Sequence, residues 1–177
     1  MEKIKINDNR IKIKFICEKD EYIKSRRKFL RESKTLSTGN IIFLIIMTII
    51  EIFFLAIHEF FFSIIIGVLL IISYVMVYIL YFLQPGKLYD KTDFIKKEML
   101  FEFSEKEILA TINKKTGKTN WNIIKEIWES EEFIFLMQSN ISYTLIPKRA
   151  FKENGDTLSL RKMYINANPN GKYKNIK

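Results

Sequence analysis

The sequence IIFLIIMTIIEIFFLAIHEFFFSIIIGVLLIISYVMVYILYFL, from Ile41 to Leu83, decides how this chain is built. Its only charged or imidazole side chains are Glu51 and the pair His58-Glu59. One straight helix would be about 65 Å long, but the apolar core of a bilayer is about 30 Å thick. The run must therefore turn, and His58-Glu59 is the place to turn. We predict two transmembrane helices, residues 41–57 and 60–83, joined in a tight hairpin.

The charges that flank the two spans predict their orientation. The chain carries a net charge of +9, and many of its cations lie beside the spans: Lys24, Arg26, Arg27, Lys28, Arg31 and Lys34 before the first, and Lys87, Lys91, Lys96 and Lys97 after the second. The loop between the spans has no Lys or Arg. The positive-inside rule therefore predicts a multi-pass inner-membrane protein with both termini in the cytoplasm.

Two elements precede the first span. Residues 1–19 alternate apolar and polar side chains, which predicts one strand or a hairpin around Asn7-Asp8-Asn9. Residues 20–38 predict a basic amphipathic helix with Asp20 as its N-cap. Such a helix suits anionic headgroups, so Arg26, Arg27, Lys28 and Arg31 are candidate binding residues. The alternative, that this helix packs on a soluble domain, is equally open.

The chain beyond the second span predicts a small α+β domain. Gln84-Pro85-Gly86 is expected to end the span. Residues 98–166 alternate as several short strands, with a turn expected around Lys114–Lys118, followed by a terminal helix. We expect an antiparallel sheet or open barrel, joined by the N-terminal strand, and a disordered tail over residues 167–177. The expected core is Phe101, Phe103, Ile108, Trp121, Ile127, Phe133, Phe135, Leu145, Phe151, Leu158 and Leu160.

The stretch ISYTLIPKRAF, Ile141 to Phe151, places two cations at a strand end. A proline suits the first position of a helical turn, so Lys148 and Arg149 would begin that turn. Cations are unfavourable at a helix N-terminus, and something must offset them. The acidic cluster Glu129–Glu132 could do so within the chain, and so could an anionic lipid or a partner. Both hypotheses stay open.

Glu51 is the one ionisable group deep in a predicted span. A charge there costs about 3 kcal/mol, so a carboxyl at this depth is neutral or has a partner. Counting back from the turn, Glu51 should face Ser63 and Gly67, and small residues there let two helices approach closely. An oligomer contact, a partner protein's span and proton coupling are the alternatives.

The sequence lacks the common catalytic motifs. Thr116-Gly117-Lys118-Thr119 resembles the end of a phosphate-binding loop, but position 112, where another glycine is needed, is Ile112. The single cysteine, Cys17, and the single histidine, His58, fall on opposite sides of the predicted membrane, which excludes a Cys–His pair and a zinc site within one chain. We expect a non-enzymatic protein without metal or cofactor and without nucleic acid as a partner.

Three short motifs carry a resemblance to a known family. They are Trp121-Asn122-Ile123-Ile124, the acidic turn Glu129-Ser130-Glu131-Glu132, and Ile146-Pro147-Lys148-Arg149-Ala150-Phe151. Together with the order of strand, helix and two spans, they make the chain similar to the YcxB-like family of bacterial membrane proteins, from about Phe15 to Ile165. The resemblance implies a cytoplasmic domain similar to the pleckstrin-homology superfold. It implies no activity and no catalytic residues.

Two functions fit these expectations. The first is a bacterial inner-membrane protein whose cytoplasmic module binds a protein or an anionic lipid, with a membrane protein or a second copy as a further possible partner. The alternative is an immunity or accessory protein that protects against, or helps to export, a membrane-active peptide. Glu51 and the hairpin tip would matter more in that case.

Overall fold

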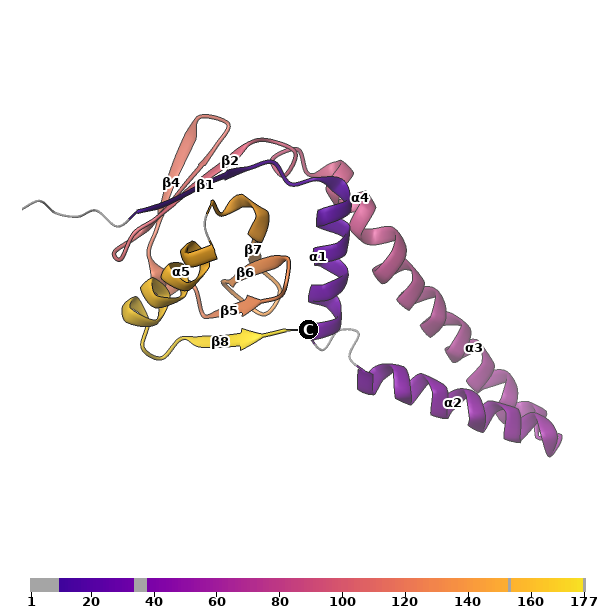
Figure 1. Ribbon diagram of the computed structural model, residues 1–177. Coiled ribbons are helices and arrows are strands. Elements are labelled where there is room, and N and C mark those ends of the chain that lie inside the picture. Colours follow the sequence, from indigo (N-terminus) through magenta and orange to yellow (C-terminus); the bar gives the residue numbers. More distant parts are fainter. Residues whose placement is uncertain (1–9, 34–37, 153, 177) are drawn as a thin grey trace, which may run out of the picture. The chain divides into compact units, whose positions relative to one another are not determined.

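The computed structural model describes residues 10–33, 38–152 and 154–176. The chain is an α+β protein and divides into two compact units, Met1–Glu21 with Thr92–Lys177, and Tyr22–Lys91 (Figure 1). The first unit holds the strands and the last helix. The second unit, called the helical unit below, holds the apolar hairpin.

The hairpin consists of two helices, α2 (Thr38–Ala56) and α3 (Phe60–Tyr78). Both are long and apolar enough to cross a membrane, and no residue of α2 is buried inside the structure. The predicted turn is at the predicted place, because the helices are separated only by residues 57–59. His58 has a positive φ of 61° there, a left-handed conformation that closes the chain tightly.

The second apolar helix does not end at Gln84-Pro85-Gly86, and this corrects the expectation from sequence. One turn of π-helix, η1 (Ile79–Leu83), follows α3, and α4 (Gln84–Lys91) then continues. Proline is tolerated in the first turn of a helix because its missing N–H is not needed there. The wide π turn brings Gln84 N–H to the Ile79 carbonyl, and Pro85 therefore falls at the start of a new helical segment.

Helix α1 (Lys19–Glu32) precedes the hairpin. It begins one residue before Asp20, so Asp20 lies in its first turn and is not its N-cap. The predicted helix ran to residue 38, whereas α1 ends at Glu32 and Leu36 lies outside the described residues. Tyr22, Phe29 and Leu30 are buried on one side of α1, as the amphipathic pattern predicts.

Strands β1 (Ile11–Phe15), β2 (Met99–Phe103), β3 (Ile108–Ile112) and β4 (Lys115–Thr119) form one antiparallel sheet in that order. Ile13 pairs with Phe101, which confirms that the N-terminal strand joins the sheet. The hairpin predicted around Asn7-Asp8-Asn9 lies outside the described residues.

The turn between β3 and β4 is earlier than the sequence predicted. It is formed by Asn113 and Lys114, with φ of 51° and 64°, and Gly117 lies within β4 opposite Ala110. Positive φ at both central residues is the geometry of a two-residue hairpin turn, and asparagine tolerates it well. The glycine therefore does not make the turn.

The second sheet contains β5 (Glu126–Glu129), β6 (Phe133–Met137), β7 (Tyr143–Pro147) and β8 (Lys172–Asn175), in the order β7-β6-β5-β8. Short 3₁₀ turns precede β5 (η2, Trp121–Ile123) and follow β7 (η3, Lys148–Ala150). Among the described residues, the strands thus form two four-stranded sheets and not one sheet. The β5–β8 pair is parallel, and the other pairs in this sheet are antiparallel.

Strand β8 lies in the segment for which the sequence predicted a disordered tail. It pairs residue by residue with β5, and Ile176 beyond it is buried and donates its N–H to the Glu129 carbonyl at 2.7 Å. Two cation–π contacts hold the strand: Lys174 over Trp128 and Arg161 over Tyr173. A polar composition concealed these anchors, because the stabilising partners are distant in sequence.

Helix α5 (Asn154–Ala167) completes the core of the first unit and lies beside the sheets in Figure 1. Leu160, Met163 and Tyr164 are its buried residues, and the Tyr164 ring contacts Trp121, which in turn contacts Phe103. Most predicted core residues are buried, but Leu158 is 60% exposed. Leu158 lies on the opposite side of the helix from the Leu160–Tyr164 face.

Candidate functional site

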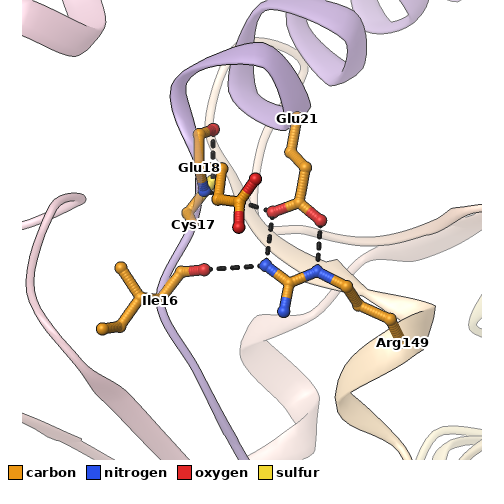
Figure 2. A network of polar contacts seen from close by, with 5 residues as sticks. All are labelled: Ile16, Cys17, Glu18, Glu21 and Arg149. Carbon is orange, nitrogen blue, oxygen red and sulfur yellow. Dashed lines mark hydrogen bonds and ion pairs between the residues drawn. The ribbon is translucent and has the colours of Figure 1, made fainter.

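Arg149 is the centre of a polar network in the first unit (Figure 2). Its guanidinium donates from Nε and Nη2 to the two carboxylate oxygens of Glu21, the Nη2 contact at 2.7 Å, and Nη2 also donates to the Ile16 carbonyl at 2.9 Å. This is the bidentate geometry in which arginine binds a carboxylate most specifically. The contact joins η3 to the junction between β1 and α1, 128 residues away in sequence.

Glu21 also accepts a hydrogen bond at the start of α1. Its Oε2 accepts the backbone N–H of Glu18 at 3.1 Å, the contact by which a side chain in the first turn satisfies a free N–H before a helix. The hydrogen bond from Arg149 is the main reason why the pKa of Glu21 lies below its ordinary value, and the same bond raises the pKa of Arg149. Both side chains are therefore charged at neutral pH.

Lys148, the neighbour of Arg149, also has an acidic partner. Its Nζ forms an ion pair with Glu129 at the end of β5, and its backbone N–H donates to the Glu132 carbonyl at 2.7 Å. Lys148 is thus paired within the chain with a residue of the acidic cluster Glu129–Glu132, as the first hypothesis expected. For Arg149 the partner is Glu21 and not the Glu129–Glu132 cluster, and no local sequence pattern could have indicated a contact over that separation.

The candidate cations of α1 belong to the helical unit and form a row. Lys24, Arg27, Lys28 and Arg31 are spaced i, i+3, i+4 and i+7, so they share one face of the helix. We call these four residues the cationic row. Arg26 lies on another face, with its Cζ 5.1 Å from the centre of the Phe29 ring. The row and Arg26 therefore belong to a different unit from Lys148 and Arg149.

Arg27 joins the cationic row to the end of the hairpin. Its Nε donates to the Tyr81 carbonyl at 3.1 Å, and its Cζ lies 5.3 Å from the ring centres of both Tyr81 and Phe82. In a regular helix the N–H of residue 85 would bond to that carbonyl. Residue 85 is proline, and Arg27 supplies the missing donor. Sequence reasoning missed this role, although a proline four residues after Tyr81 indicates that the Tyr81 carbonyl needs another donor.

Helix α1 lies alongside α4 within the helical unit. The rings of Tyr22 and Tyr89 are 5.7 Å apart, and a methyl group added at Gly86 would lie 3.9 Å from Ile23 Cδ1. Residues 22, 23 and 27 of α1 thus contact residues 89, 86 and 81 in that order, so α1 runs antiparallel to the segment formed by η1 and α4. The cationic row is therefore held beside the end of the second apolar helix.

The prediction that Glu51 faces Ser63 and Gly67 is confirmed. Ser63 Oγ donates to Glu51 Oε1 at 2.6 Å, and a Cβ added at Gly67 would lie 3.3 Å from the same oxygen. Glu51 Oε2 is buried without a hydrogen-bond partner among the described residues. A second polar contact joins Thr48 and Tyr74 at 2.8 Å. Because the Thr48 hydroxyl hydrogen is used on the Leu44 carbonyl, Tyr74 is the donor.

Two further observations bear on chemistry. Burial raises the pKa of the Cys17 thiol to about 12, so the thiolate needed for nucleophilic attack or metal ligation is suppressed. Within residues 10–33, 38–152 and 154–176, no group of three His, Cys, Asp or Glu side chains is arranged to hold a metal ion.

Comparison with known proteins identifies a YcxB-like domain in this chain. The family model described as YcxB-like protein matches residues 103–161, from the last residue of β2 into α5. The resemblance is thus confirmed over this stretch, which is narrower than the range from Phe15 to Ile165 expected from sequence. Neither the search of curated proteins nor the search of solved structures found a match.

Proposed function

We propose that this chain is a non-enzymatic inner-membrane protein of a bacterium. The hairpin of α2 and α3 is its membrane anchor, both termini lie in the cytoplasm, and the YcxB-like domain is held at the inner surface of the membrane. The observation that carries the proposal is the exposure of α2: an apolar helix with none of its residues buried needs lipid around it, since a soluble protein would bury such a helix.

In this proposal the cationic row of α1 faces the lipid headgroups. The Glu51–Ser63 bond supports a hairpin built for lipid, because polar side chains in a membrane pair across helices. Arg27 holds the cationic row beside the end of the second apolar helix, and this position makes the row a better candidate for anionic headgroups than Lys148 and Arg149. Cationic side chains beside the end of a membrane helix are attracted to the anionic lipids of the inner leaflet.

The domain is proposed to adopt the pleckstrin-homology superfold that the family resemblance implies. Two sheets with a helix after the seventh strand support this comparison. The fold would not define a ligand, because ligands are recognised by particular sites and not by a superfold. A protein partner that binds the domain therefore remains part of the proposal, together with the lipid surface.

Membrane insertion and orientation are tested together by cysteine labelling in intact cells. In a Cys17→Ala background, Glu59→Cys at the hairpin tip should react with a membrane-impermeant maleimide, whereas Lys106→Cys in the loop between β2 and β3 should react only after the cells are opened. The membranes should retain the chain in alkaline carbonate and release it in detergent. Release by carbonate, or labelling of Lys106→Cys in intact cells, would refute the proposal.

A truncation distinguishes the alternative function. A protein of the immunity or accessory class should keep its function when the chain stops after Lys91, because the hairpin would then suffice. If the chain instead acts through the YcxB-like domain held at the membrane, the same truncation should abolish its function.

A further inference from the structure

We propose that Arg27 and the cationic row form a binding site for the phosphate group of one anionic phospholipid at the inner membrane surface. The inference rests on the proposed function, and it adds a defined site, a ligand class and named residues to a general attraction of cations to the membrane. The site lies entirely in the helical unit, between α1 and the segment formed by η1 and α4.

The position of Arg27 is the first argument. The Nε contact with Tyr81 and the two flanking rings hold the guanidinium at the end of the second apolar helix. Arg27 donates no other hydrogen bond among the described residues, so the N–H groups on its two Nη atoms are available to a ligand. A planar guanidinium fixed in this way can bind two oxygens of a phosphate side by side, which a lysine cannot do.

The row around Arg27 supplies the remaining charge. Lys28 is half-buried beside it, and Lys24 and Arg31 are exposed on the same face. Lys87 and Lys91 lie on α4, the helix along which α1 runs. Several Lys and Arg directly beside a membrane helix are typical of binding to anionic headgroups, worth about a fivefold gain in affinity for each charge near the surface.

The aromatic residues place the site at headgroup depth. Tyr78, Tyr81 and Phe82 form a chain of ring contacts at 5.1 and 5.4 Å, and tyrosine is enriched where hydrocarbon meets headgroups. The π turn at Ile79–Leu83 adds a local irregularity of a kind often found at functional sites. A lipid whose phosphate contacts Arg27 would place its acyl chains beside η1, where Phe82 and Leu83 are exposed.

Native mass spectrometry of the full chain in a neutral detergent tests the site. Phosphatidylglycerol and phosphatidylcholine are titrated separately, and an apparent dissociation constant is obtained for each. We expect one phosphatidylglycerol to bind more tightly than phosphatidylcholine. Lys28→Gln should weaken phosphatidylglycerol about fivefold, and Arg27→Lys should weaken it by a similar factor despite its unchanged charge. Lys115→Gln on β4, which removes an equal charge far from α1 in sequence, should have no effect.

Several results would overturn the site. Equal affinity for the two lipids would overturn it. Equal weakening by Lys28→Gln and Lys115→Gln would also do so, because the lipid would then be attracted by the net charge of the chain and not by a defined site. Arg27→Lys with full affinity would exclude the guanidinium geometry. If Arg27→Lys unfolds, Lys28→Gln decides alone, because Lys28 has no described contact with the hairpin. Inorganic phosphate that competes as strongly as the lipid would show a free-anion site. A chain that stays in carbonate-washed membranes but shows no lipid preference would refute this inference and leave the anchor intact.

Discussion

Arg27 donates its Nε–H to the carbonyl oxygen of Tyr81 at 3.1 Å, the oxygen that Pro85 leaves without its regular helical donor. The bond shows how a proline is tolerated close to the end of the second apolar helix: a neighbouring helix supplies the missing hydrogen bond. It also connects the cationic row of α1 to the hairpin. Substitutions at Arg27 therefore need a design that separates this structural role from lipid binding.

A double-mutant cycle makes that separation. Arg27→Gln should destabilise the hairpin by about 1–2 kcal/mol, because a carbonyl in an apolar setting loses its partner. In a Pro85→Ala background the new N–H can donate to Tyr81, so the same substitution should cost about 1 kcal/mol less. Loss of helical circular dichroism during titration with a denaturing detergent measures both. Strictly additive effects would contradict the assigned role of Arg27.

The Arg149–Glu21 pair predicts a dependence of stability on pH. The pKa of Glu21 is lowered in the folded chain, so its stabilising contribution is complete above its ordinary pKa of 4.5 and is lost as pH falls through the lowered value. Arg149 is about half exposed, which limits the pair to about 1 kcal/mol. Arg149→Gln should therefore abolish the decrease in stability between about pH 5 and the lowered pKa of Glu21.

Tryptophan fluorescence follows this unfolding, because Trp121 and Trp128 both lie in the first unit. Glu21→Gln should lower stability at pH 7 by a similar amount, and the double variant should show no further loss. Lys148→Gln, which breaks the neighbouring pair with Glu129, is the control and should keep the acid-side decrease of the wild-type chain. If the Arg149→Gln profile matched that of the wild type, the network would have no energetic importance.

The C-terminal strand depends on the absence of a side chain at Gly171. A Cβ there would overlap Tyr164 Oη and Cζ and lie 3.0 Å from the Asn168 carbonyl oxygen. The Tyr164 hydroxyl donates to the Lys125 carbonyl at 3.0 Å beside β5, so it cannot move without losing that bond. Gly171→Ala should cost about 1–3 kcal/mol and release β8. Gly155→Ala, where a Cβ meets nothing within 4 Å, should be neutral or stabilising. Equal stabilities of the two variants, measured by fluorescence, would contradict this.

The comparison of sequence and structure shows which features local patterns can predict. The hairpin was predictable because a long apolar run interrupted by one short polar pair indicates two helices and a turn, and the Glu51–Ser63 contact followed from counting residues from the turn. The alternation of Met99–Phe103 and Ile108–Ile112 likewise predicted β2 and β3. These features depend on neighbours within a few residues or on the tight turn.

The misplaced turn between β3 and β4 was a local error, but several other errors concern contacts between distant residues. The strand β8 has a polar sequence and is held by Trp128, Arg161 and the β5 backbone, none of which its own residues indicate. Arg27 of α1 donates to the Tyr81 carbonyl, the position that Pro85 leaves without its regular donor. The partner of Arg149 is Glu21, 128 residues away in sequence, and not the acidic cluster Glu129–Glu132. In each case a partner more than ten residues away decided the structure.

The turn between β3 and β4 offers a test of backbone strain. Lys114 has a φ of 64°, a conformation that glycine adopts without the steric cost of a Cβ. Lys114→Gly should therefore stabilise the first unit by about 0.5–1 kcal/mol. Lys115→Gly, one residue later within β4, should destabilise it, because glycine weakens a strand. Thermal unfolding followed by tryptophan fluorescence distinguishes the two, and a shift of both variants in the same direction would count against the described turn.

The contact between Glu51 and Ser63 predicts how the hairpin responds to loss of a hydroxyl. Ser63→Ala removes the one described donor to Glu51 Oε1, and the hairpin should lose about 0.6–1.7 kcal/mol, from the average to the maximum found by double-mutant cycles for hydrogen bonds between membrane helices. Ser73→Ala is the matched control and should cost little, since the only partner of the Ser73 hydroxyl among the described residues is the Leu69 carbonyl of its own helix. Glu51→Gln should keep most of the stability, because an amide oxygen still accepts from Ser63, whereas Glu51→Leu should lose as much as Ser63→Ala. The denaturing-detergent titration used for Arg27 measures all four variants. If Ser63→Ala and Ser73→Ala behaved alike, the bond would have no part in holding the two helices together.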